Sequence, residues 1–175
     1  MDITLDQLLR ARDRRQLRQQ ELLAIAAAHD GHAVATLMCL TVVMPGAEKR
    51  NNLSLTVARA AVDALLDALL GHLAFHETAD LPTGFEAYFL VTLPPVEAKL
   101  LACRIEREHP LGRLFDIDVI APNGVPVERQ SVGQPPRKCL LCDNDARVCM
   151  RVHTHTQQQL LRHIRTLVSQ YGANR

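Results

Sequence analysis

Two aspartates separated by one residue stand inside an apolar run, FDIDVI, near the middle of the chain. In an extended strand alternate side chains share a face, so Asp116 and Asp118 point one way and their apolar neighbours point the other. Two carboxylates this close repel each other and require water, a cation or a basic group nearby. The pair fits Mg²⁺, which binds oxygen ligands together with substrate phosphates. An exposed edge strand with solvated acids is the alternative interpretation.

A second group of reactive side chains lies in the stretch RKCLLCDNDARVCMRVHTH. Cys139 and Cys142 have the C-x-x-C spacing that lets two thiolates bind one ion, and Cys149 with His153 or His155 completes a tetrahedral Zn²⁺ site. The gaps are shorter than those of a standard zinc finger. A redox dithiol, or buried cysteines that behave as small hydrophobic side chains, are the alternatives.

Length and composition limit the class of protein that carries these groups. With 175 residues, 47% of them hydrophobic and 22% charged, we expect one globular domain over 1–175, with a Cys/His-rich C-terminal segment at about 137–155. The chain has no apolar run of about eighteen residues, which excludes a membrane span. Its N-terminus lacks the pattern of a secretory signal, and its odd number of cysteines does not suggest a disulfide framework. We therefore expect a cytoplasmic protein with reduced thiols or metal-bound cysteines.

Hydrophobic periodicity predicts the elements that position these residues. Thr4 and Gln7 form a capping box at the start of a helix whose apolar side carries leucines from Leu5 to Leu23 and Ile25. The pattern predicts helices over 4–29, 53–73, 96–108 and 157–171, strands over 34–43 and 87–93, the Asp-x-Asp strand, and a returning hairpin arm over 125–129. The sum is an α+β fold with a small mixed or antiparallel sheet packed with helices.

The first helix concentrates five arginines in the run RARDRRQLRQQ. A solvated helix face is one interpretation, and a surface for an anion or an acidic partner is the other. A net charge of +1 and an aromatic content of 3% disfavour nucleic acid, because single-strand binders offer stacking rings in basic grooves.

Taken together, GRLFDIDV, PPRKCLLC and ARVCMRVHTH resemble the apo-citrate lyase phosphoribosyl-dephospho-CoA transferases, the holo-acyl-carrier-protein synthases of citrate lyase. The resemblance extends over nearly the whole chain through LLRARDRRQLRQQ, MPGAEK and TGFEAYF. It implies a nucleotidyl-type transfer from triphosphoribosyl-dephospho-CoA to a serine of the acyl carrier (gamma) subunit, with pyrophosphate released. The pattern G-R-x-x-D-x-D also looks like a shortened form of the Gly-Ser and Asp-x-Asp elements of polymerase-β-like nucleotidyltransferases, an analogy that implies a nucleotidyltransferase-like fold.

This resemblance gives the aspartates a use, because Mg²⁺ neutralises charge that spreads over the phosphate oxygens and the leaving pyrophosphate. Asp116 and Asp118 are the expected metal ligands and catalytic residues. The expected phosphate-binding residues are a glycine that admits the backbone and basic side chains that pair with phosphate: Gly112, Arg113, Arg129, Arg137 and Lys138. A general base, one of the aspartates or Glu128, would take the serine proton.

The resemblance also favours His155 over His153 as the functional histidine. Acyl carrier proteins are generally acidic and dock on basic faces, so the expected docking residues are the arginines of the first helix: Arg10, Arg14, Arg15 and Arg18. An alternative from another functional class is a non-catalytic, zinc-stabilised protein-binding module. A redox role for Cys139 and Cys142 is disfavoured, since the motif does not open a helix after a first strand.

Overall fold

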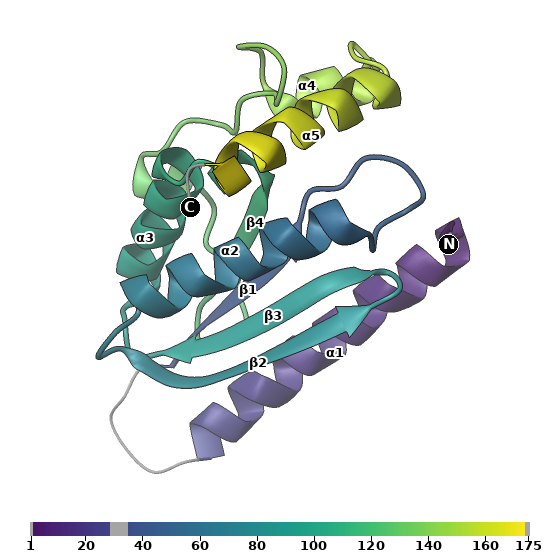
Figure 1. Cartoon of the computed structure of the whole chain (residues 1–175). Coiled ribbons are helices and arrows are strands. Elements are labelled where there is room, and N and C mark those ends of the chain that lie inside the picture. Colours follow the sequence, from purple (N-terminus) through teal and green to yellow (C-terminus); the bar gives the residue numbers. More distant parts are fainter. Residues whose placement is uncertain (1, 29–34, 174–175) are drawn as a thin grey trace.

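The computed structural model describes residues 2–28 and 35–173 and has an α+β architecture (Figure 1). Four strands form one sheet in the order β2-β3-β1-β4: β1 (Thr36–Val42), β2 (Leu73–Leu81), β3 (Gly84–Val91) and β4 (Phe115–Ile120). Every neighbouring pair is antiparallel. The predicted α+β class with a small sheet is confirmed, and the Asp-x-Asp strand β4 lies at one edge of that sheet.

Helices cover both faces of the sheet. The long helix α1 (Leu5–Ala28) lies on one face, and α2 (Asn52–Ala68), α3 (Pro95–Glu108) and α5 (Gln157–Ala173) pack on the other (Figure 1). The short helix α4 (Ala146–Arg151) precedes α5 in the chain, and two 3-10 turns, η1 (Gly112–Leu114) and η2 (Gln130–Val132), flank β4 along the chain. The site residues therefore come from β4 and from the segments directly around it.

Alternation along the strands builds two separate apolar clusters. Met38, Leu40, Phe89 and Ile117 face the side of α2, α3 and α5 in the larger cluster. The smaller cluster, against α1, contains Leu22 with the strand residues Leu37, Cys39, Tyr88, Leu90 and Ile120. The two aspartates of β4 alternate with residues of the larger cluster, so they lie on the α1 face of the sheet.

Two expectations about strands change. The segment 73–81 is a strand that the sequence analysis missed, because as the other edge strand it carries mostly polar and partly exposed side chains. The expected hairpin arm over 125–129 forms only in part: an antiparallel bridge joins Ile120 and Pro126, and the Val127 N–H donates to the Val119 carbonyl at 2.8 Å, but no strand forms. Pro126 has no N–H to extend a ladder, and Arg129 turns inward to a carboxylate of α3.

The α1 helix begins as expected and docks differently. The Gln7 side chain accepts the Thr4 N–H at 2.9 Å, and the Thr4 hydroxyl accepts the Gln7 N–H at 3.3 Å. The predicted common apolar face is wrong, because Leu22 is buried while Leu5 and Leu17 are 72% and 57% exposed. The expected helix end at 29 and strand start at 34 lie outside the described residues.

Within residues 2–28 and 35–173, none of the helices has the length and apolar character needed to cross a membrane.

Candidate functional site

The two aspartates of β4 form an acidic pair on the α1 face of the sheet. Their partners on β1 are Thr41, opposite Asp116, and Cys39, opposite Asp118. The Thr41 hydroxyl lies 3.4 Å from the Asp116 carboxylate, and Asp118 is exposed. The strand geometry therefore points both carboxylates in one direction, where water and a ligand can reach them.

The charges around the pair are unbalanced. Although the Asp118 residue is exposed to solvent on one side, desolvation by the surrounding protein, and then repulsion from Asp116, raise the pKa of Asp118 above its ordinary value, and the nearby Lys99 ammonium opposes this increase. Burial also raises the pKa of Cys39, across the strand from Asp118, to about 12, so that this thiol stays protonated at neutral pH. A cation bound between the Asp116 and Asp118 side chains would stabilise the ionised form of Asp118.

The outer edge of β4 is closed by side chains of α3. Glu106 accepts the Ile117 N–H at 2.9 Å, and Lys99 Nζ donates to the Ile117 carbonyl at 3.3 Å. Both side chains are buried, at 5% and 6% exposure. Neither residue was predicted as part of the site, although two charged positions seven apart in a helix predicted to pack on the core were an available signal. They fix the backbone of the residue between the two aspartates.

Glu106 brings together two of the predicted phosphate-binding residues. Arg129 and Arg137 both bond its carboxylate, and the Arg137 bond is 2.6 Å long. Arg137 also donates to the Phe115 carbonyl at 2.7 Å and lies 3.4 Å from the Asp116 carboxylate. A buried carboxylate of α3 therefore holds both guanidinium groups, and that of Arg137 lies beside Asp116.

The other predicted phosphate-binding residues have different surroundings. Gly112 packs so closely on the end of α3 that a Cβ atom there would lie 2.6 Å from the carbonyl oxygens of Ile105 and Glu106. Arg113 donates to the Lys138 carbonyl at 2.9 Å and to the Cys139 carbonyl. The exposed Lys138 ammonium bonds Asp143 at 3.0 Å. The structure brings Arg113 and Lys138 to the cysteine segment, and their role toward phosphate stays a prediction.

Three of the four predicted docking arginines pair with acids of the sheet. Arg14 and Arg15 bond the buried Glu86 at 2.8 and 3.2 Å, and Arg18 bonds Glu77 through two contacts of 2.6 Å. Glu86 lies in one cross-strand row with Thr41 and Asp116, so these arginines share the sheet face of the aspartates. The fourth, Arg10, is 79% exposed and pairs with Asp6 on its own helix.

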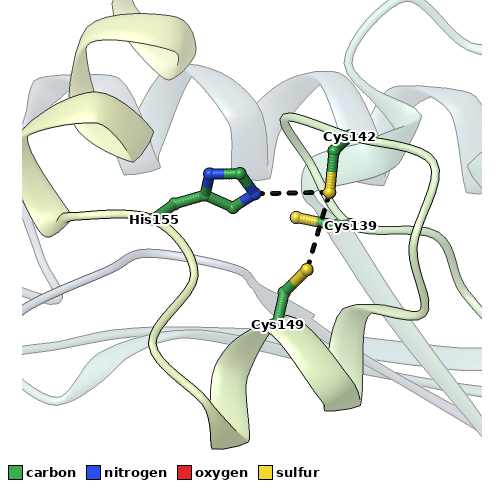
Figure 2. A group of neighbouring side chains, drawn as sticks. All are labelled: Cys139, Cys142, Cys149 and His155. Carbon is green, nitrogen blue, oxygen red and sulfur yellow. Dashed lines mark hydrogen bonds between the residues drawn. The ribbon is translucent and has the colours of Figure 1, made fainter.

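The cysteine segment gathers four side chains into one cluster (Figure 2). The ligand atoms of Cys139, Cys142, Cys149 and His155 all lie within 4.8 Å of one another. The Cys142 sulfur is 3.5 Å from that of Cys149 and 3.3 Å from His155 Nε2. Within the described residues, this is the group of three or more such side chains that can hold a metal ion.

The geometry of this Cys₃His cluster separates the interpretations left open by its sequence. All its cysteines are free thiols, and a sulfur separation of 3.5 Å is well beyond the roughly 2.05 Å of a disulfide. Four ligands around zinc, with Zn–S bonds of about 2.3 Å, place sulfurs roughly 3.8 Å apart. His155 belongs to the cluster, whereas His153 is exposed and has a positive φ of 49°.

The thiols of the cluster titrate differently. Burial acts to raise the pKa of Cys139, but hydrogen bonds from the Leu141 and Cys142 backbone and from neighbouring thiols together lower it. Burial, and then the neighbouring thiols, raise the pKa of Cys149 despite a bond from Thr154. A metal ion binds thiolates, so a thiol whose proton is already destabilised favours binding.

Comparisons with known proteins identify the family to which the chain is similar. The family model described as "Apo-citrate lyase phosphoribosyl-dephospho-CoA transferase" matches residues 3–171. A protein of Vibrio cholerae (strain M66-2) named a probable member is 36% identical over 98% of this chain and 95% of its own. Proteins of Shigella flexneri and Streptococcus pyogenes with the corresponding names are 34% and 33% identical, over 98% and 90% of this chain and 91% and 81% of their own.

Proposed function

The chain belongs to the apo-citrate lyase phosphoribosyl-dephospho-CoA transferase family, and from this premise we propose which of its residues perform the transfer. It is a transferase that installs the prosthetic group of citrate lyase. The proposed donor is triphosphoribosyl-dephospho-CoA, and the acceptor is a serine hydroxyl of the acyl carrier (gamma) subunit. The serine oxygen attacks the phosphorus next to the ribose, a phosphodiester forms, and the bond to the leaving pyrophosphate breaks.

Asp116 and Asp118 hold the catalytic Mg²⁺ in this proposal. The observation that carries it is two carboxylates on one face of an edge strand, with the pKa of Asp118 raised by burial and by its neighbour. Such a donor set fits a hard divalent cation. When bound, Mg²⁺ neutralises charge on the phosphate oxygens of the donor. Lys99 and Glu106 hold the strand backbone, and hence the angle between the two carboxylates.

The arginines beside the pair bind the phosphate chain of the donor. Arg137 and Arg129 are about one quarter exposed, so their guanidinium groups reach solvent while Glu106 holds them from behind. A guanidinium held by a carboxylate loses less rotational freedom when it binds a phosphate than a free one does. Gly112, Arg113 and Lys138 complete the proposed phosphate-binding set.

An aspartate of the pair takes the proton of the acceptor serine. A general base works best when its pKa lies close to the operating pH. Desolvation and repulsion raise the pKa of Asp118, and a bound Mg²⁺ would oppose this rise, so the base is assigned to the pair and not to one residue of it. Glu128 is exposed on the segment after β4, and its role as a base stays a prediction.

The Cys₃His cluster holds a structural Zn²⁺ in this proposal. Three thiols and one imidazole within 4.8 Å are a ligand set that zinc prefers over harder ions. Four protein ligands leave no open position, which is typical of a structural site and not of a catalytic one. Free cysteines in this arrangement support a reducing, cytoplasmic location.

The carrier docks on the face of α1 in this proposal. Arg10 is the most exposed of the four arginines, while Arg14, Arg15 and Arg18 are partly neutralised by Glu86 and Glu77. An acidic carrier helix would compete for these guanidinium groups, and it would meet Arg10 first.

The experiment that tests this function is the intact mass of the apo carrier subunit after incubation with the protein, Mg²⁺ and triphosphoribosyl-dephospho-CoA. Wild type should add the mass of the phosphoribosyl-dephospho-CoA group. Asp116→Asn and Asp118→Asn should add none while remaining folded, and Asp67→Asn, an exposed change on α2, should behave as wild type. If wild type modifies nothing with any divalent metal, the protein is better explained as a zinc-stabilised binding module.

A further inference from the structure

Three consecutive residues join the acidic pair to the Cys₃His cluster. The Arg137 side chain reaches Glu106, the Phe115 carbonyl and Asp116, at 2.6, 2.7 and 3.4 Å. Two residues later, Cys139 is a member of the cluster. The backbone that carries the guanidinium group is therefore also the backbone that carries a potential metal ligand.

Backbone hydrogen bonds make this junction a closed loop. The Arg137 carbonyl accepts the Ala146 N–H at 2.8 Å, and the Cys139 N–H donates to the Asn144 carbonyl at 2.7 Å. Lys138 and Asp145 form an antiparallel bridge between them. Because α4 begins directly after the loop and carries Cys149, a bond from Cys149 to the ion would hold the far side of the loop as well.

A second tie comes from the start of β4. Arg113 donates to the carbonyls of both Lys138 and Cys139. The turn that bears Arg113 has no room to shift, since Gly112 packs on the end of α3. The contacts of Arg137 and Arg113 therefore hold the loop next to the acidic pair on two sides.

Apart from these hydrogen bonds and from Leu140, which packs partly buried against the larger apolar cluster, the segment has little buried surface. Between residues 131 and 155, all of which the structure describes, the two buried residues are Cys139 and Cys149, both members of the cluster. Val148, Met150 and Val152 are exposed at 53%, 73% and 63%. A segment without its own apolar core is ordered by cross-links, and a metal ion is such a cross-link.

We propose that a zinc ion in the Cys₃His cluster acts as a clamp that positions Arg137 beside Asp116, so that loss of the ion weakens binding of the donor's triphosphate. This inference rests on the proposed zinc site and on the proposed donor site. Arg137 is the group that contacts phosphate, and the four ligands are positioning residues that act through it.

The test is a double-variant cycle that measures donor affinity by titration calorimetry, with zinc content measured on each protein. The variants are Arg137→Ala, His155→Ala and both together. The matched controls are His153→Asn, which keeps the positive φ two residues away, and Arg151→Ala on α4. Arg137→Ala and His155→Ala should each weaken donor binding about tenfold or more, as expected for residues that support a bound group. The double variant should be no weaker than Arg137→Ala alone.

If the losses of donor affinity in the two single variants multiply in the double variant, the clamp proposal is wrong, because the two sites then act independently. Full donor affinity in zinc-free protein, or a wild type that takes up no zinc, also overturns it. The carrier mass assay is run on the same samples. Transfer that continues without zinc would leave the proposed function intact, and transfer absent from zinc-loaded wild type would contradict the function itself. The control variants should keep both zinc and donor affinity.

Discussion

The Glu106 carboxylate of α3 accepts the backbone N–H of Ile117 at 2.9 Å, so a buried side chain holds the edge strand midway between Asp116 and Asp118. The same carboxylate bonds Arg129 and Arg137. Glu106 therefore holds both the strand that carries the two aspartates and the two arginine side chains of the proposed site.

Replacing Glu106 with Gln should destabilise the protein and reduce transfer. The amide oxygen can still accept the Ile117 N–H, but two guanidinium groups lose their buried counter-charge. Breaking a buried ion pair on one side costs about 3–5 kcal/mol. Chemical denaturation measures the loss. The matched control is Glu108→Gln, because Glu108 is exposed on the same helix and pairs with its exposed neighbour Arg107. Equal stability of the two variants would contradict this role.

Asp118→Asn should raise the melting temperature at pH 7 while it abolishes transfer. The folded-state pKa of Asp118 lies above its ordinary value, so the folded protein binds this proton more tightly than the unfolded chain does. The ionised carboxylate therefore costs stability at neutral pH. That cost falls as the pH drops through the folded pKa, and it vanishes below the ordinary value. The melting temperatures of wild type and Asp118→Asn should converge as the pH falls from 7 to about 4. If Asp118→Asn is less stable than wild type at pH 7, the repulsion between Asp116 and Asp118 does not destabilise the folded protein.

Lys99→Met should move the acidic limb of the pH–rate profile to higher pH. The Lys99 ammonium lowers the pKa of Asp118 by charge attraction, so its loss raises that pKa further. Protonated Asp118 can neither bind a cation nor accept a proton. Lys99→Arg, which keeps the charge, is the comparison variant. An unshifted acidic limb in Lys99→Met would mean that another group controls it.

Arg18→Ala should reduce stability at neutral pH by about 1 kcal/mol, since the Arg18–Glu77 pair is partly exposed. A side-chain hydrogen bond from Arg18 lowers the pKa of Glu77. The stabilisation is therefore present above the ordinary carboxyl pKa and is lost as the pH falls through the lowered value.

Arg10→Ala separates this structural role from carrier docking. Arg10 is exposed and pairs with Asp6 on the same helix, so its loss should leave stability unchanged and raise the KM for the carrier. Stability curves and carrier titrations on the two variants distinguish the roles. A carrier KM unchanged in both variants would remove α1 as the docking face.

The sequence by itself determined the elements and the chemistry of the reactive groups. Apolar periodicity located β4 and the helices α2, α3 and α5, because burial of one face imposes the spacing of the apolar residues. The spacing of Cys139, Cys142 and Cys149 predicted a metal cluster as one of three interpretations, since these residues lie close along the chain. The edge strand β2 was missed because its side chains are exposed or only partly buried, so that its sequence has little apolar alternation.

Only the tertiary structure decided which distant residues meet. Glu106 and Lys99 belong to a helix, and nothing in their spacing states that the open edge of β4 lies against them. Unpaired backbone groups of an edge strand must find partners, and the packing of α3 determines which side chains supply them. The sequence predicts a free basic face on the first helix, but in the structure Glu86 and Glu77 of the sheet pair with three of its arginines: Arg14, Arg15 and Arg18. Local spacing therefore specifies a ligand set, whereas ion pairs between elements depend on the fold.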